Sequence, residues 1–259
     1  MLNFSANLSM LYTDLPFLER FAAAARDGFR AVEYVSPFDH DKHTVAEALR
    51  GAGLAQALFN VPCGNWAAGE RGIACIPERI EEFRFGIPKA IEYAEELGCD
   101  RLNVLAGIAP QAHDVELLEK TFVDNLRFAA RQCADKGIRL LIEPVNTRDV
   151  PGFYLSTLPQ AERIMEAVGS DNFFLQFDFY HVQVMEGNLV ENFRRLHQRI
   201  AHVQIADNPG RHAPGTGEIN YPFIFEELAR LGYDGWVGCE YVPEGPTSDS
   251  LVWMSAYGN

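Results

Sequence analysis

The chain is poor in the features that mark secreted, membrane-spanning and thiolate-metal proteins. Its cysteines number five in 259 residues and are widely spaced, and none forms a CxxC pair, which argues against a disulfide framework or a thiolate zinc site. No apolar run approaches the roughly 20 residues that span a bilayer, and the N-terminus lacks the basic start and apolar stretch of a secretory signal. We therefore expect a cytoplasmic protein whose cysteines are small buried hydrophobes.

Positive charge is also scarce. The sequence holds 22 Lys and Arg against 36 Asp and Glu, a formal net charge of -14. Such a chain repels a phosphate backbone and an anionic membrane surface, and no basic stripe offsets this locally. We expect neither nucleic acid nor a membrane as a partner, and the sequence leaves homo-oligomer formation open.

Short apolar, β-rich runs alternate with longer helical patterns along the whole chain, which is typical of successive βα units around a parallel sheet. Eight strands are predicted, at residues 4–9, 31–35, 54–60, 101–106, 138–145, 173–178, 201–206 and 236–241. The helical stretches include residues 15–27, 45–53, 80–97, 117–136, 159–168 and 223–231. This repeat predicts one α/β domain over residues 1–259, a closed (β/α)8 TIM barrel. An open doubly wound sheet is the alternative, but no strand leads into GxGxxG or a Walker loop.

Side-chain alternation predicts which strand residues face the barrel interior, because neighbours along a strand point to opposite sides. One parity is largely apolar and suits packing against the helices. The other parity is polar and comprises Ser5, Asn7, Glu33, Gln56, Asn60, Asn103, Glu143, Gln176, Asp178, His202, Gln204 and Glu240. So many polar groups in a barrel interior are costly without a metal or a polar ligand to pair with. Asn7 is one candidate for such a ligand contact.

The strongest candidates for chemistry are Glu143, Asp178, Gln204 and Glu240, each at or near the end of one of the last four predicted strands. Active sites of barrels lie at these strand ends. Three carboxylates and an amide oxygen suit one divalent metal ion, Mg²⁺ or Mn²⁺, better than structural zinc. The alternative is that they are unrelated capping or solvent-facing groups.

Nearby residues could contact a substrate. His181 follows Asp178 by one turn and could reach the same pocket, or it could be a helix-start histidine bonded to backbone. Arg211, in the loop after the seventh strand, could hold a carboxylate with its planar guanidinium, and Arg71 is a second candidate. The alternative for either arginine is simple solvation.

The long loop after the third strand, residues 63–77, is rich in Gly and Ala. We predict that it forms a lid over the site, with Trp66 excluding water. The alternative is a surface excursion that packs on itself.

The sequence resembles the hydroxypyruvate isomerases within the xylose-isomerase-like TIM barrels, nearly from end to end. The resemblance rests on residues 4–10 (FSANLSM), 66–77 (WAAGERGIACIP), 142–144 (IEP), 204–209 (QIADNP), 214–221 (PGTGEINY) and 235–241 (GWVGCEY).

The resemblance implies a metal held by Glu143, Asp178, Gln204 and Glu240, with both glutamates transferring protons. The implied reaction interconverts hydroxypyruvate, a keto acid, and tartronate semialdehyde through an enediolate, and the sequence does not say which glutamate abstracts the proton. Two positions depart from the family pattern: Asn65 stands where Asp is expected and Val242 where Lys is expected. Lost charge there could change substrate preference.

Other activities on this barrel remain open. A sister group acts on 2-oxo-tetronate, and the wider class includes ketose epimerases. A sugar or keto-acid binding protein that has lost catalysis is the non-enzymatic alternative, and retention of the four oxygen ligands weighs against it. A DNA-repair endonuclease is disfavoured by the acidic charge and the lack of a histidine-rich zinc set.

Overall fold

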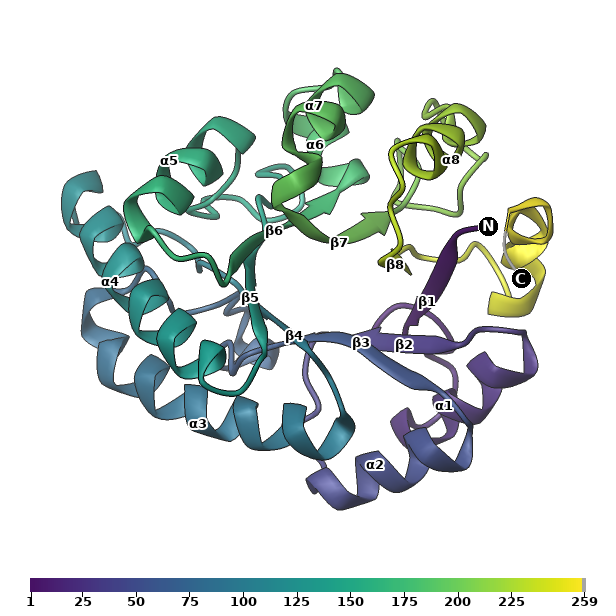
Figure 1. Ribbon diagram of the computed structural model, residues 1–259, viewed down its shortest axis with the longest axis horizontal. Coiled ribbons are helices and arrows are strands. Elements are labelled where there is room, and N and C mark those ends of the chain that lie inside the picture. The colour runs from purple at the N-terminus through teal and green to yellow at the C-terminus, as the bar shows by residue number, and fades with distance from the viewer. Residues whose placement is uncertain (258–259) are drawn as a thin grey trace.

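The computed structural model describes residues 1–257, and residues 258 and 259 of the predicted domain lie outside this range. Eight parallel strands close into one barrel in chain order, β1 to β8, with β1 paired to β8 (Figure 1). The strands are β1 (Asn3–Asn7), β2 (Ala31–Tyr34), β3 (Ala55–Asn60), β4 (Arg101–Val104), β5 (Arg139–Ile142), β6 (Phe173–Asp178), β7 (Ile200–Ile205) and β8 (Trp236–Cys239). The predicted (β/α)8 barrel is confirmed.

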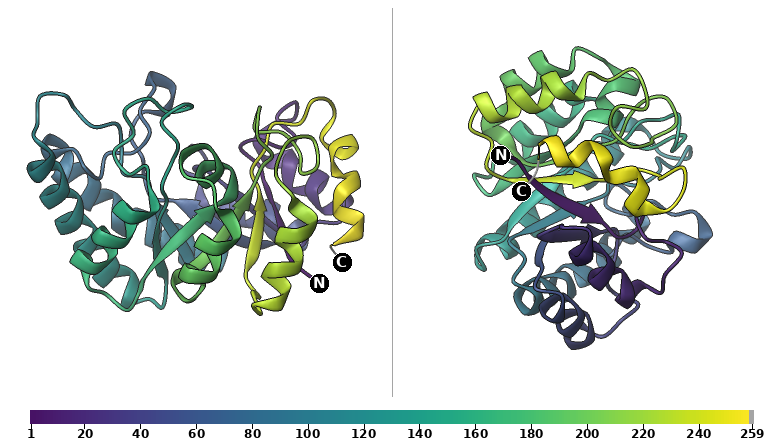
Figure 2. Two further views of the ribbon diagram at one scale, coloured as in Figure 1. Left: turned by 90° about the horizontal axis from the view of Figure 1, so that it is seen from above. Right: turned by 90° about the vertical axis from the view of Figure 1, so that its right-hand side faces the viewer.

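Helices form a ring outside the strands (Figures 1 and 2). The α-helices are α1 (Phe17–Arg26), α2 (Lys42–Gly51), α3 (Ile80–Leu97), α4 (Val115–Ala134), α5 (Leu158–Val168), α6 (Phe179–Met185), α7 (Leu189–Leu196) and α8 (Tyr221–Arg230). Short 3-10 segments are η1 (Trp66–Ala68), η2 (Pro77–Arg79), η3 (His197–Arg199) and η4 (Thr247–Ala256). No helix within residues 1–257 is both long and apolar enough to cross a membrane.

Helix termini carry the expected capping chemistry. Asp41, Asp114 and Thr157 each accept a backbone N–H of the helix that follows, which satisfies donors that have no partner inside the helix. Gly98 and Gly169 end α3 and α5 in the left-handed conformation that glycine adopts without strain. These caps explain why the predicted bounds of α3 and α5 agree closely with the structure.

Several predicted strands extend too far along the chain. Strands β1, β4 and β8 end at Asn7, Val104 and Cys239 rather than at residues 9, 106 and 241. The fifth strand ends at Ile142 rather than at residue 145, because Pro144 has no N–H to donate to a neighbouring strand. The sequence patterns also gave no helix between β6 and β7, where α6 and α7 lie. Asp178 is both the last residue of β6 and the N-cap of α6, so no turn sequence separates the strand from the helix.

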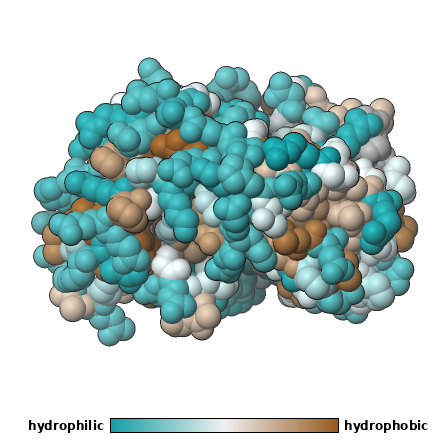
Figure 3. All heavy atoms as spheres, turned by 90° about the horizontal axis from the view of Figure 1, so that it is seen from below, coloured by the Kyte–Doolittle hydropathy of each residue, from teal (hydrophilic) through white to brown (hydrophobic). Residues whose placement is uncertain are grey.

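The core has two parts, as the strand parity predicts. Apolar residues of the outward parity, such as Ala6, Val104, Phe177 and Val203, are fully buried beneath the helices. The inward parity is largely polar and equally buried, with Glu33 and His202 at 0% exposure. It also includes Leu58 and Leu141, which form a small apolar cluster separate from the main core. The face of the molecule drawn in Figure 3 is largely hydrophilic, with several smaller apolar areas among the hydrophilic side chains. The five cysteines are buried and free, as expected.

Candidate active site

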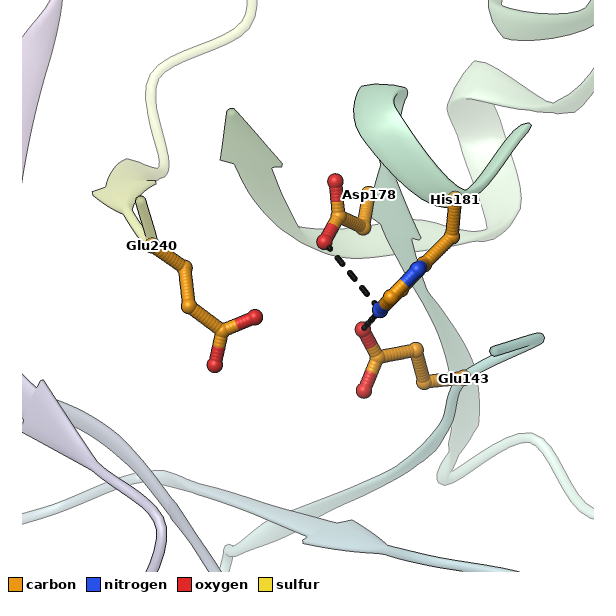
Figure 4. Close-up of side chains that lie close together, drawn as sticks. All are labelled: Glu143, Asp178, His181 and Glu240. Carbon is orange, nitrogen blue, oxygen red and sulfur yellow. Dashed lines mark ion pairs between the residues drawn. The ribbon is translucent and has the colours of Figure 1, made fainter. Parts of the chain in front are cut away.

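The strand ends bring the predicted metal-ligating residues to one end of the barrel. Asp178 closes β6 and stands in register with Gln204 of β7, while Glu143 and Glu240 directly follow β5 and β8. All of them are buried. The side chains of Glu143, Asp178 and Glu240 point toward a common centre, together with His181 of α6 (Figure 4).

This cluster could hold a metal ion. Ligand atoms of Glu143, Asp178, His181 and Glu240 all lie within 4.8 Å of one another. Two carboxylate oxygens, Glu143 Oε1 and Asp178 Oδ2, are buried without a hydrogen-bond partner in residues 1–257. Buried acceptors that lack a donor are costly, and three converging carboxylates also repel one another. A divalent cation would relieve both costs, so the donor set fits such an ion.

The pKa values of the acids reflect this crowding. Burial raises the pKa of Glu143 well above its usual range, and the neighbouring Glu240 and Asp178 raise it further. Burial raises the pKa of Glu240 to about 7 and that of Asp178 to about 6, although the Arg211 guanidinium opposes both shifts. Without a cation, the site therefore retains protons near neutral pH.

Asp178 is oriented by the start of α6. Its Oδ1 accepts the backbone N–H of Tyr180 at 2.8 Å, the hydrogen bond of a helix N-cap. This interaction leaves Oδ2 directed at the site, 3.5 Å from His181 Nε2. One carboxylate thus begins a helix and supplies a free oxygen to the cluster.

Glu240 is held from two sides. Asn7 Nδ2 donates to its Oε1 at 2.9 Å, and Arg211 Nη2 pairs with its Oε2. Arg211 also lies 3.8 Å from Asp178 Oδ2, and its buried Nε has no partner among the described residues. Its backbone adopts a positive φ of 59° in the loop after β7, an uncommon conformation for a residue with a side chain. The guanidinium therefore lies among the acids, and its Nε–H has no acceptor among the described residues.

A buried network lies beneath the cluster and is centred on Glu33 of β2. Its carboxylate accepts from Ser5 Oγ at 2.8 Å, Asn7 Nδ2 at 3.2 Å and Gln204 Nε2 at 2.7 Å, and it faces His202 Nε2 at 2.8 Å. Gln204 Oε1 in turn accepts from Gln176 Nε2 at 2.6 Å. Glu33 therefore touches two residues that border the cluster.

Sequence reasoning did not single out Glu33. Strand parity placed it in the interior, but the convergence of its partners from two other strands, β1 and β7, depends on the closure of the barrel. His202, expected to be a hydrogen-bond partner behind the site or a core histidine, is fully buried against Glu33.

Asn146 was also missed. It lies in the loop after β5, is fully buried, and its Nδ2 is 2.8 Å from His181 Nδ1. The available signal was the spacing of Asn146 and Asp149, which suits a side-chain turn in which the asparagine oxygen accepts nearby backbone N–H groups.

The predicted lid, residues 63–77, contributes Trp66 and Arg71 to the cavity above the carboxylates, where they join Asn7, His181, Arg211 and the two glutamates. The Arg71 guanidinium lies 4.0 Å from the centre of the Trp66 ring, and its Nη1 donates to the backbone oxygen of Glu70 at 2.7 Å. Glu70 pairs with Arg79 at 2.7 Å, so the loop is fixed to η2. Trp66 itself is 42% exposed.

Asn65 and Val242, the two positions that depart from the family pattern, have different structural roles. The Asn65 side chain accepts the N–H of Ala68 at 3.1 Å and so caps η1. Val242 is 47% exposed, while its backbone N–H donates to the Arg211 backbone oxygen at 2.7 Å and its carbonyl faces His212 Nδ1 at 2.8 Å. Val242 thus supports the loop that carries Arg211 through its backbone.

The chain is similar to known proteins over its whole length. The model of a family described as xylose isomerase-like TIM barrel matches residues 21–257. A 2-oxo-tetronate isomerase of Cupriavidus necator is 48% identical over 254 residues, 98% of each chain. A hydroxypyruvate isomerase of Escherichia coli is 48% identical over 257 residues, 99% of this chain and all of the relative. A crystal structure named AP endonuclease, family 2, from Brucella melitensis superposes with a TM-score of 0.97 at 43% identity, with complete coverage of both chains.

Proposed function

The chain belongs to the xylose isomerase-like TIM barrel family, and from this premise we propose that it is a divalent-metal-dependent isomerase that interconverts hydroxypyruvate and tartronate semialdehyde. The observation that carries the proposal is the buried cluster of Glu143, Asp178 and Glu240, which includes two carboxylate oxygens without a partner in the described chain. The full-length relative named hydroxypyruvate isomerase supports the choice of substrate.

Glu143, Asp178, Gln204 and Glu240 would hold the cation. These are oxygen donors, which favours Mg²⁺ or Mn²⁺. A bound cation supplies a Lewis acid that polarises the substrate carbonyl.

The two glutamates would carry the proton transfer. Isomerisation moves one proton from C3 of hydroxypyruvate to C2 and the hydroxyl proton from the C3 oxygen to the C2 oxygen, through an enediolate of the substrate. One of Glu143 and Glu240 removes the C3 proton, and the other delivers a proton to C2. The pKa of Glu240, about 7, supports this role, because a carboxyl group with a pKa near neutrality can both take and return a proton. Burial also raises the pKa of Glu143.

The surrounding residues would bind the substrate. Arg211 is suited to its carboxylate, because the guanidinium Nε has no partner in residues 1–257, and Arg71 is a second cation on the same cavity. Asn7 would orient Glu240, which it already contacts, and His181 would contact a substrate oxygen. Trp66 would exclude water from above the reacting atoms, within a lid formed by residues 63–77.

A 2-oxo-tetronate is the second candidate substrate. A relative with that name is as similar to this chain as the hydroxypyruvate isomerase is, at 48% identity. Val242 leaves an exposed apolar side chain beside the Arg211 loop, where a lysine would add a charge that favours a small acid. Cleavage of DNA is disfavoured by the net charge of -14, despite the name of the Brucella melitensis relative.

The test strips the enzyme with a chelator and restores Mg²⁺, Mn²⁺, Zn²⁺ or Ca²⁺ singly, with hydroxypyruvate, 2-oxo-tetronates and ketoses as substrates. We expect turnover of hydroxypyruvate only after metal is restored, with Mg²⁺ or Mn²⁺ most effective. Undiminished turnover by the stripped enzyme would contradict the metal requirement. If only a 2-oxo-tetronate were turned over, the proposed substrate would be wrong, but the proposed metal-dependent isomerisation would stand.

A further inference from the structure

Every hydrogen-bonding group of the buried Asn146 side chain is used. Its Oδ1 accepts the backbone N–H groups of Arg148 at 3.0 Å and Asp149 at 2.8 Å. Its Nδ2 donates to Asp149 Oδ2 at 3.0 Å and lies 2.8 Å from His181 Nδ1. Rotating the amide by 180° would turn its NH₂ group against two N–H donors and its oxygen against a carboxylate. The amide N–H that faces His181 is therefore fixed.

This arrangement determines where the imidazole carries its proton. Because Asn146 donates, His181 Nδ1 must accept, so the ring is neutral and its single proton is on Nε2. Nε2 lies 3.5 Å from Asp178 Oδ2 and 3.7 Å from Glu143 Oε1 (Figure 4). Both distances exceed an N–H···O hydrogen bond, so the N–H is directed into the site and is not committed to either acid.

The usual arrangement of a metal-bound histidine is the reverse. There the nitrogen away from the metal donates its N–H to a carboxylate or carbonyl, which leaves the other nitrogen with a lone pair for the metal. Here the nitrogen away from the cluster accepts, and the nitrogen that faces the cluster is protonated. A protonated Nε2 has no lone pair to donate to a metal ion. His181 therefore cannot act as a ligand through Nε2, although its ring lies within 4.8 Å of ligand oxygens of the three acids.

We propose that Asn146 is a positioning residue that selects the His181 tautomer and so assigns His181 to a substrate oxygen as a hydrogen-bond donor, not to the metal. The inference rests on the proposed function, since the acceptor is the carbonyl or hydroxyl oxygen of the keto acid. Asp149 strengthens the arrangement, because its Oδ2 accepts from both Asn146 Nδ2 and the Tyr180 hydroxyl at 2.9 Å. Tyr180 precedes His181 on α6, so the loop after β5 is tied to the helix that carries the imidazole.

The experiment compares the wild type with Asn146→Asp and Tyr180→Phe. The aspartate places an acceptor opposite Nδ1 and also faces Asp149 Oδ2. The two adjacent carboxylates should together draw the imidazole proton to Nδ1, leaving a lone pair on Nε2. Tyr180→Phe removes one hydrogen bond to Asp149 but keeps the Asn146 amide. Long-range ¹H–¹⁵N spectra of metal-free, substrate-free protein report the tautomer, and the signal of His181, one of seven histidines, is the one lost in His181→Gln.

We expect a protonated Nε2 in the wild type and in Tyr180→Phe, and a protonated Nδ1 in Asn146→Asp. A protonated Nδ1 or an imidazolium in the wild type at pH 7.5 would overturn the proposal. Electron spin echo spectroscopy of the Mn²⁺-loaded proteins gives a second measure. The wild type should lack ¹⁴N coupling from a directly bound imidazole, and Asn146→Asp should acquire it. Such coupling in the wild type would equally overturn the proposal.

Turnover gives a third measure. If His181 donates to the substrate, Asn146→Asp should lower kcat by about 10²-fold, the scale of one lost donor at a reacting oxygen, while Mn²⁺ affinity is kept or increased. Unchanged kcat together with a reversed tautomer would overturn the role in substrate binding. The spectra need no substrate. A wild type with the Nε2–H tautomer that converts neither keto acid would therefore refute the proposed function but support the tautomer assignment.

Discussion

The Glu33 carboxylate occupies the space beside Gly238 in which any larger residue would need its Cβ. A Cβ built on Gly238 would lie 2.3 Å from Glu33 Oε2 and 2.4 Å from Oε1. Strand β8 therefore requires glycine at this position because a carboxylate from β2 lies against its backbone. Asn7 and Gln204, which border the proposed metal site, both donate hydrogen bonds to Glu33. Their orientation therefore depends on the position of the Glu33 carboxylate.

Gly238→Ala should destabilise the protein by about 1–3 kcal/mol, the range for overfilling a packed core. It should also weaken Mn²⁺ binding, because a displaced Glu33 no longer holds Asn7 and Gln204. Chemical denaturation and Mn²⁺ titration of the stripped protein measure the two effects. Gly51→Ala is the matched control, since a Cβ on Gly51 meets nothing within 4 Å. Equal behaviour of the two variants would show that Glu33 moves aside without cost.

Exchanging the groups at positions 33 and 204 tests how Gln204 is oriented. Glu33 can only accept from Gln204 Nε2, which turns Oε1 away from Glu33. Glu33→Gln offers an N–H as well, so the Gln204 amide can reverse together with that of Gln176, whose Nε2 now donates to Gln204 Oε1 and whose Oε1 has no partner in residues 1–257. Mn²⁺ affinity should then fall 10- to 100-fold, as for other residues that orient metal ligands. The double variant Glu33→Gln with Gln204→Glu restores a donor facing an acceptor and should recover most of the affinity.

Ser5→Ala is the control. It removes one hydrogen bond to Glu33 but leaves the Glu33 carboxylate as the acceptor of the Gln204 Nε2 hydrogen bond. Its effect on Mn²⁺ affinity should be several-fold smaller than that of Glu33→Gln. Mn²⁺ binding to Glu33→Gln as tight as to the wild type would refute the orienting role, and failure of the double variant to recover would do the same.

The sequence predicts the barrel well because alternation and helix caps are local signals. Parity alone identified Asn7, Glu33 and His202 as interior residues, and each is buried there. The boundary of β6 and α6 is different, since Asp178 ends one element and caps the next without intervening residues. The start of α6 was therefore considered only as the alternative for His181, because a helix of seven residues gives too short a periodic pattern to be recognised.

Relationships between distant residues could not be predicted from local patterns. Asn146 and His181 are 35 residues apart, and the tautomer follows from which amide atom faces the ring, which depends on the turn at residues 146–149. Likewise, the sequence indicated that Arg211 could bind a carboxylate but not that Glu240 would be its partner in the folded chain. Such pairings are fixed only when the barrel closes.

Glu240→Gln should keep the fold and lose about 10²- to 10⁴-fold of turnover, the usual contribution of a positioned acid or base. The amide keeps the shape of the side chain but cannot take or return a proton. Rates are compared at saturating metal, so that weaker metal binding is not mistaken for lost proton transfer. Glu92→Gln is the control, because Glu92 is an exposed carboxylate paired with Lys42 at 3.1 Å on the outer surface. Near-wild-type turnover by Glu240→Gln would contradict the mechanism with two glutamates.

The stability of the metal-free protein should depend on pH in the direction set by the raised pKa values. Glu240 has a pKa of about 7 in the folded protein against an ordinary 4.5, and Asp178 about 6 against 3.8. Between these limits the folded state holds more protons than the unfolded state, so the contribution of these groups to stability falls as pH rises. The midpoint of thermal unfolding should therefore decrease from pH 5 to pH 8.

Metal should oppose this loss, because a divalent cation neutralises the carboxylates once they are ionised and binds only the folded state. At pH 8, saturating Mn²⁺ should raise the unfolding midpoint, whereas at pH 5 protons compete for the same oxygens and the gain should be small. Other acids also titrate in a chain of net charge -14, so the comparison with Glu240→Gln isolates the site. That variant cannot ionise at position 240, and its metal-free midpoint should fall less steeply with pH. If the unfolding midpoint of Glu240→Gln fell with pH as steeply as that of the wild type, Glu240 would titrate at its ordinary pKa. The neighbouring acids would then not raise the pKa of Glu240.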